Sequence, residues 1–144
     1  MHRLVAAALV AAYLFLVAHL TLTDPSNGRW AFSLADRVAV RLSDGALTWT
    51  ETEVLANIAL FVPLGFLLTI ATGSAWVAVT LCALLSAGIE WMQLTLLPTR
   101  VPTLDDVVHN SLGGVVGAAV AVVCLALVAG ATGSRRRAAV SARG

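Results

Sequence analysis

The sequence contains no lysine, and charged residues of all kinds occupy only 12% of its 144 positions. Soluble domains carry about 25% charged residues, so this shortage argues against an ordinary soluble domain. The nine basic residues are all arginine and the net charge is +1, which leaves no broad basic surface. Binding to DNA or RNA requires such a surface, so we exclude nucleic acid as a partner.

Cysteine and the signatures of catalytic or metal sites are also scarce. Cys82 and Cys124 lie in apolar stretches without the spacing of a zinc or redox motif, and we expect both to be small core residues. The chain has no phosphate-binding loop and no nucleophile elbow. His19 and His109 lie near carboxylates, but no two histidines share a metal-ligand spacing. We therefore expect neither a metal nor another cofactor.

What the chain has instead is apolar residues, which make up 59% of it and give a mean hydropathy of +0.89. They gather in four stretches, each close to the ~20 residues that a helix needs to cross a hydrocarbon core. Of the 17 Asp, Glu and Arg residues, 16 lie outside these stretches. The sequence predicts a single all-α domain, residues 1–144, that is an integral membrane bundle of four transmembrane helices at about 4–22, 54–72, 75–97 and 107–131.

The orientation of this bundle follows from the arginines nearest the membrane. Arg135, Arg136 and Arg137 form the densest basic cluster, and the positive-inside rule predicts that this tail, residues 132–144, is cytoplasmic. Four spans then place both termini of a multi-pass cell-membrane protein in the cytoplasm. The first span starts with positive charge, as a signal peptide does, but it exceeds the usual ~7 to 15 residue apolar core and no cleavage sequence follows. We expect a retained helix.

Residues 23–53 would then face outward, between the first two spans. Ser33–Asp36 resembles a capping box, and apolar residues recur every four positions after it, which favours a short interfacial helix. A plain loop is the alternative. Thr50–Glu53 is a second capping box that predicts the start of the second membrane helix, and Thr103–Asp106 predicts the start of the fourth.

Three of the predicted helices carry polar residues at one depth. At a rise of 1.5 Å per residue, Asn57 and Asn110 lie about 5 Å below the outer ends of their helices. Gln93 lies roughly 6 Å and Glu90 roughly 10 Å below the outer end of the third helix. Arg100 falls in the short outer turn beside them. We expect these side chains to form one polar cluster near the outer face.

Glu90 is the only formally charged residue inside a predicted span. A carboxylate there costs ~2.5 kcal/mol or more unless it is paired or reaches water, so it should not face lipid. Two interpretations remain open. Glu90 pairs with Arg100, or bonds in its protonated form to Asn57 or Asn110, and only holds helices together. Alternatively, Glu90 belongs to a functional site.

The fourth predicted helix carries Asp106, Asn110, Gly113 and Gly117 on one face. The two glycines allow a neighbouring helix to approach closely, and we expect this to bring the polar residues toward the Glu90 helix. Pro63 removes a backbone amide from the second helix and predicts a bend there.

Three segments carry a resemblance to a known family. Asn57–Phe66, Ile89–Gln93 and Arg100–Gly114 are similar, in this order and spacing, to the VanZ-like family of small membrane proteins. The family is named for a member that raises resistance to the glycopeptide antibiotic teicoplanin, and it has no established reaction. His109 departs from the family pattern, which has an apolar residue there. By matching position, the resemblance implies a site made of Asn57, Glu90, Gln93, Arg100, Asp106 and Asn110.

Two functions are compatible with these residues. In the first, the outer cluster recognises or modifies a lipid-linked envelope precursor: Glu90, Arg100 and Asp106 are the catalytic candidates and Asn57, Gln93 and Asn110 bind the substrate. In the second, the protein is a non-catalytic structural or interaction component. Membrane lipid is a partner in both, and oligomerisation is left open. Proton-coupled transport ranks third because four helices enclose only a small pathway.

Overall fold

The computed structural model describes residues 2–22, 25–97 and 103–141, and every element in these ranges is an α-helix. Four of the helices are long and apolar enough to cross a membrane, which confirms the predicted all-α architecture. The fifth lies between the first two spans, where a helix or a loop was expected. The helices are α1 (His2–Leu22), α2 (Pro25–Leu42), α3 (Trp49–Thr72), α4 (Ala75–Leu96) and α5 (Leu104–Ser141).

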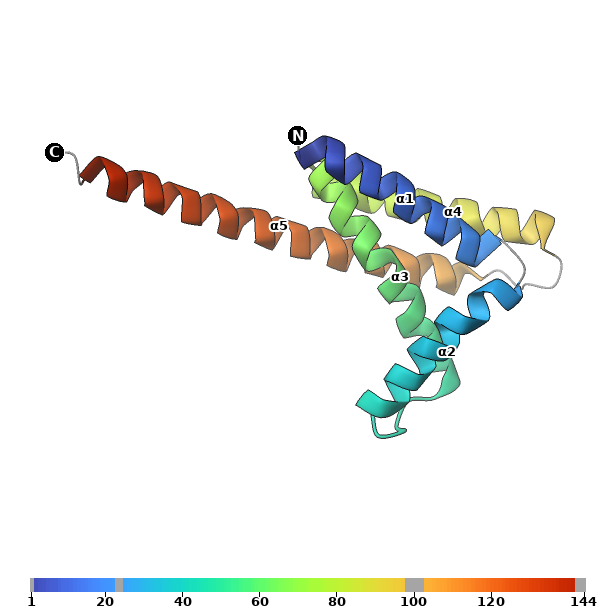
Figure 1. Ribbon diagram of the computed structural model, residues 1–144. Coiled ribbons are helices and arrows are strands. Elements are labelled where there is room, and N and C mark those ends of the chain that lie inside the picture. The colour runs from blue at the N-terminus through green and yellow to red at the C-terminus, as the bar shows by residue number, and fades with distance from the viewer. Residues whose placement is uncertain (1, 23–24, 98–102, 142–144) are drawn as a thin grey trace.

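The helices do not form a simple parallel bundle (Figure 1). Helix α4 runs alongside both α1 and α5, whereas α3 crosses them at a steep angle and α2 folds back beside the first half of α3. Helix α5 continues well beyond the others, so its second half stands alone. Both termini lie toward the same side of the bundle, as an even number of spans requires.

Two of the predicted helix starts were wrong. Helix α2 begins eight residues before Ser33, and Ser33 lies inside it, with its carbonyl accepting a 3.0 Å hydrogen bond from Arg37 Nε. The capping box of α3 is Thr48–Glu51 instead of Thr50–Glu53: Thr48 accepts from the Glu51 amide at 3.3 Å, and Glu51 Oε2 accepts from the Thr48 amide at 2.8 Å. Both segments have a threonine three residues before a glutamate, so the pattern alone does not distinguish them.

Glycines bring α3 and α5 into backbone contact. A Cβ atom added to Gly113 would collide with the Ile58 carbonyl, and one added to Gly117 would collide with the Val62 carbonyl. The predicted close approach at these two glycines is therefore confirmed, but it is made to α3 and not to the Glu90 helix. Gly114 provides the approach to α4, where its added Cβ would lie 2.6 Å from Cys82 Cβ.

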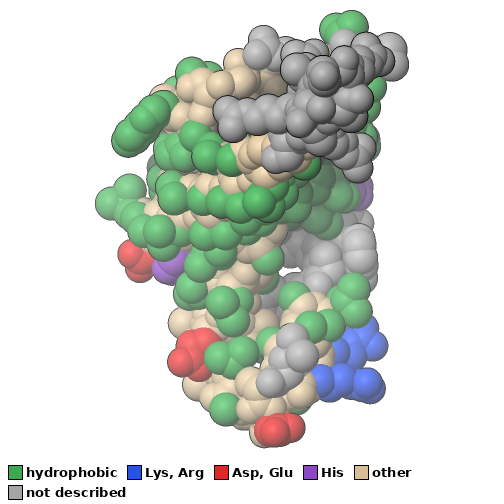
Figure 2. Space-filling model, turned by 90° about the vertical axis from the view of Figure 1, so that its left-hand side faces the viewer, with side chains coloured by type: hydrophobic (Ala, Val, Ile, Leu, Met, Phe, Trp, Pro, Cys, Tyr) green, Lys and Arg blue, Asp and Glu red, His purple; other side chains and the backbone are tan. Residues whose placement is uncertain are grey.

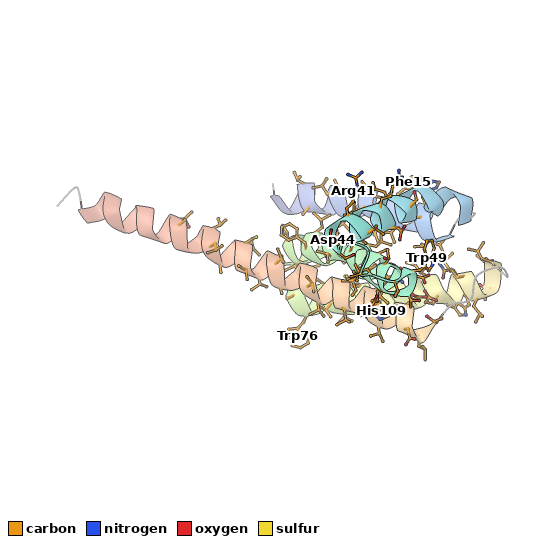
Figure 3. The ribbon with its side chains drawn as sticks, turned by 90° about the horizontal axis from the view of Figure 1, so that it is seen from below. Phe15, Arg41, Asp44, Trp49, Trp76 and His109 are labelled. Carbon is orange, nitrogen blue, oxygen red and sulfur yellow. The ribbon has the colours of Figure 1, made fainter. Side chains whose placement is uncertain are left out.

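The core lies where α1, α3 and α4 meet, around Phe61, Leu64 and Cys82, none of which is exposed. The outside of the bundle is also apolar: Figure 2 shows hydrophobic side chains gathered across the middle of the displayed face, and Trp76, 84% exposed, points away from the helices in Figure 3. Such a surface suits hydrocarbon. Cys124 is exposed on the second half of α5, so the expectation that it is a core residue was wrong.

Candidate functional site

The site begins with the N-terminus of α5, which Thr103 caps. Thr103 Oγ1 accepts a 3.2 Å hydrogen bond from the Asp106 amide and donates a 3.0 Å bond to Asp106 Oδ2. The predicted cap is therefore confirmed. A complete capping box also needs the Asp106 carboxylate to accept from the Thr103 amide, and in this protein that amide has another partner.

That partner is Glu90 on α4. Its Oε2 accepts a 3.1 Å hydrogen bond from the Thr103 amide, so a carboxylate from a different helix performs half of the capping. The positive end of the α5 dipole stabilises a negative charge at this position. The side chain is half-buried, as the cost of a carboxylate in lipid requires.

Asn57 on α3 completes the arrangement. Its Nδ2 donates a 2.6 Å hydrogen bond to Asp106 Oδ1, so both carboxylate oxygens of Asp106 have partners. We call Asn57, Asp106, Thr103 and Glu90 the polar chain, since each is hydrogen-bonded to the next across α3, α5 and α4. Of the partners considered for Glu90, Asn57 is not the one found, because the amide of Asn57 donates to the carboxylate of Asp106 on α5 instead.

Asn110 lies one turn further along α5 and is only 6% exposed. Its Nδ2 donates a 2.9 Å bond to Ser86 Oγ on α4, and its buried Oδ1 has no hydrogen-bond partner among the described residues. The amide of Asn110 therefore joins α5 to α4 through Ser86. The bond between Glu90 and Asn110 that was considered from the sequence is not made. Ser86 was missed, although Ser86, Glu90 and Gln93 share one helical face at spacings of four and three.

Gln93 makes a different connection. Its Nε2 donates a 2.9 Å bond to the backbone carbonyl of Thr21, the next-to-last residue of α1. Carbonyls in the last turn of a helix lack a partner within the helix, so Gln93 caps α1. It is 6% exposed and its bond leads away from the polar chain, contrary to the single cluster expected.

The remaining predicted site residue, Arg100, lies outside the described residues, and so does its expected pairing with Glu90. Asp105 is exposed beside Asp106, and His109 is half-buried on α5. Among the residues that the structure describes, no three His, Cys, Asp or Glu side chains lie close enough to hold a metal ion.

The polar chain therefore brings together three of the six predicted site residues and adds Thr103. Its two carboxylates, Glu90 and Asp106, meet at one threonine at the start of α5. Carboxylates accept hydrogen bonds strongly from hydroxyl, amide and ammonium groups. A site of this composition suits the donor-rich head of a ligand, reached from the end of the bundle where α5 begins.

Comparisons with known proteins identify the family. The sequence profile of VanZ/LLP1 matches residues 7–126, which include most of α1, all of α2 to α4, the whole polar chain and more than half of α5. No curated protein and no solved structure gives a significant match to the chain. Because the profile covers most of the sequence, the chain belongs to the VanZ/LLP1 family.

Proposed function

We propose that this VanZ/LLP1 membrane protein uses the polar chain to recognise the head of a lipid-linked precursor of the bacterial cell envelope. The observation that carries this proposal is the meeting of two half-buried carboxylates, Glu90 and Asp106, at Thr103. A pair of acids is costly in a membrane protein and is retained where it has a function. Its place at the end of apolar helices suits a ligand whose tail lies in the bilayer.

Each member of the polar chain has a distinct role in this proposal. Glu90 and Asp106 accept hydrogen bonds from hydroxyl or amide groups of the ligand, while Asn57 and Thr103 fix the orientation of Asp106. Arg100 holds an anionic group, as the family resemblance implies. A carboxylate held in this way is also suited to accept or donate a proton, should the ligand be modified.

Gln93 and Asn110 have a narrower role in this proposal than the substrate binding that the sequence predicted for them. The amide nitrogen of each is bonded to another helix, Gln93 to α1 and Asn110 to α4. We propose that they position the helices that carry the polar chain and do not touch the ligand.

The proposed orientation places the polar chain in the outer leaflet of the cell membrane, with both termini in the cytoplasm. Support comes from the arginine-rich tail and from the two termini lying on one side of the bundle (Figure 1). In this orientation the protein meets precursors on the side where glycopeptide antibiotics act, so we extend the proposal to teicoplanin resistance.

A second function is favoured by a specific observation. Asn57, Gln93 and Asn110 each donate to a group of the protein itself, as amides that only fasten helices would do. In this alternative the protein is a non-catalytic structural or interaction component, and Glu90 is an unusual helix cap.

Resistance measurements distinguish the two functions. A teicoplanin-sensitive bacterium expresses the wild-type chain, Glu90→Gln or Asp105→Asn at matched membrane levels. Gln retains an oxygen for the Thr103 amide but loses the charge, and Asp105 is an exposed acid outside the polar chain. We expect resistance from the wild type and Asp105→Asn and at least a fourfold loss for Glu90→Gln. Equal resistance of all three would support the fastening role.

A further inference from the structure

An apolar groove of 460 Å³ lies between α1, α3 and α4. Every residue that lines it is apolar, and the buried side chains of Phe61 and Leu64 from α3 belong to the lining. The volume is within the ~300 to 1,000 Å³ typical of small-molecule pockets. The groove is separate from the polar chain, whose members are absent from its lining.

Two partly buried polar contacts hold α1 at a fixed position beside this groove. Toward its inner end, Tyr13 Oη donates a 2.8 Å bond to the carbonyl of Leu60 on α3. Toward the other end, Gln93 donates its 2.9 Å bond to the carbonyl of Thr21. Because α1 is held at its middle and near its C-terminal end, it cannot simply collapse onto α4 and close the space between them.

Gly88 on α4 provides the open space itself. It lines the groove, and a Cβ atom added there would have no atom within 4 Å. This glycine is unlike Gly113 and Gly117, whose missing side chains are replaced by the backbone of α3. No described part of the chain lies within 4 Å of the space at Gly88, so this space is available to another molecule.

The length of the groove indicates what that molecule is. Its lining runs from Leu14 to Leu22 on α1 and from Leu81 to Met92 on α4. At 1.5 Å per residue these segments are about 12 and 16 Å long, close to half of the ~30 Å hydrocarbon core. The groove therefore extends over one leaflet, in the half of the bundle that carries Glu90.

A groove lined almost entirely by apolar atoms offers water few hydrogen bonds, and left empty it would forfeit dispersion contacts along its length. Its walls belong to helices that are apolar enough to cross a membrane, so it is continuous with the lipid-facing surface. We infer that the groove binds one acyl chain of a membrane phospholipid, seated between α1 and α4 over Gly88.

This inference does not depend on the proposed function. Gly88 and Glu90 are two residues apart, so the groove at Gly88 and the side chain of Glu90 lie on nearly opposite faces of α4. A ligand of the polar chain and a lipid in the groove would contact different faces of the same helix. Loss of one is therefore distinguishable from loss of the other.

Photocrosslinking tests the inference in bilayer nanodiscs made with a phospholipid that carries a diazirine on one acyl chain. Labelled peptides are quantified by mass spectrometry for the wild type, for Gly88→Leu and Gly88→Phe, and for Gly130→Phe. The last variant is the matched control, because Gly130 lies on the free half of α5 and its added Cβ also meets nothing within 4 Å. Label on residues 81–92 is divided by label on residues 122–132, all of which are exposed on α5.

We expect this ratio to exceed one severalfold in the wild type and in Gly130→Phe. It should fall at least fivefold in Gly88→Phe, with Gly88→Leu between them. A ratio near one in the wild type would overturn the inference, whether or not the Gly88 variants fold. So would an unchanged ratio in folded Gly88→Phe, or competition of the label by polyprenyl lipids but not by phospholipids.

Discussion

Asn57 and Asp106 are 49 residues apart in the sequence, yet a 2.6 Å hydrogen bond joins the amide of one to the carboxylate of the other. The bond fixes the first turn of α5 against α3, about two turns before the contacts that the glycines of α5 make with the same helix. It also aligns Asp106 with Thr103, and through Thr103 with Glu90 on α4. Three helices are thus positioned by one connected set of polar groups.

Replacing Asn57 should lower stability by an amount that depends on Asp106. Asn57→Leu leaves a half-buried carboxylate oxygen without its donor, and we expect a loss of about 1 to 3 kcal/mol. The measurement is unfolding in detergent of both single variants and of Asn57→Leu combined with Asp106→Leu. A double-mutant cycle should give a coupling of at least ~0.5 kcal/mol. Additive effects would show that the bond does not contribute.

A side chain at Gly117 should separate α5 from α3. Its Cβ would collide with the Val62 carbonyl, a backbone atom that cannot rotate away, so Gly117→Ala should cost about 1 to 3 kcal/mol. Gly130→Ala is the control, because its Cβ meets open space and alanine favours a helix over glycine by up to ~1 kcal/mol. Thermal unfolding followed by circular dichroism compares them. Equal melting temperatures would contradict the close approach of the two helices.

Removing the amide of Gln93 should release the end of α1. Gln93→Leu leaves the Thr21 carbonyl uncapped, and we expect a loss of about 0.5 to 1.5 kcal/mol with faster proteolysis near residue 22. Thr95→Ala serves as the comparison, since Thr95 bonds only to carbonyls of its own helix. If both variants resist protease equally, Gln93 does not fasten α1.

Asn110 and Ser86 should behave as a polar pair that is replaceable only as a whole. Ser86→Ala leaves a buried amide unsatisfied and should cost about 1 to 3 kcal/mol, whereas Ser86→Ala with Asn110→Leu removes both partners and should restore much of that loss. Unfolding free energies in one detergent provide the comparison. A double variant less stable than either single variant would contradict this account.

The four spans could be predicted from sequence because each requires only an apolar run of sufficient length, as in residues 4–22. Helix starts were harder. Thr48–Glu51 and Thr50–Glu53 are equally good capping patterns. The choice between them depends on the path of the chain after the turn at Asp44 and Gly45, which both have positive φ.

The site was predictable in composition but not in its connections. The spacing of Asn57, Glu90 and Asp106 places them at one end of the bundle, as the structure shows. The partner of Glu90 is a backbone amide, which no pattern of side chains identifies. The partners of Gln93 and Asn110 depend on the steep crossing of α3 and on which helix faces each amide, and both follow from tertiary packing (Figure 1).

The central claim is that the polar chain binds a ligand, and direct binding tests it most simply. A fluorescent polyprenyl-diphosphate-linked disaccharide-peptide is titrated into nanodiscs containing the wild type, Glu90→Gln or Asp105→Asn, each with its melting temperature measured in parallel. We predict saturable binding to the wild type and Asp105→Asn, and a Kd raised at least about tenfold, or ~1.4 kcal/mol, in folded Glu90→Gln. Absence of saturable binding, or the same Kd in all three proteins, would contradict the claim.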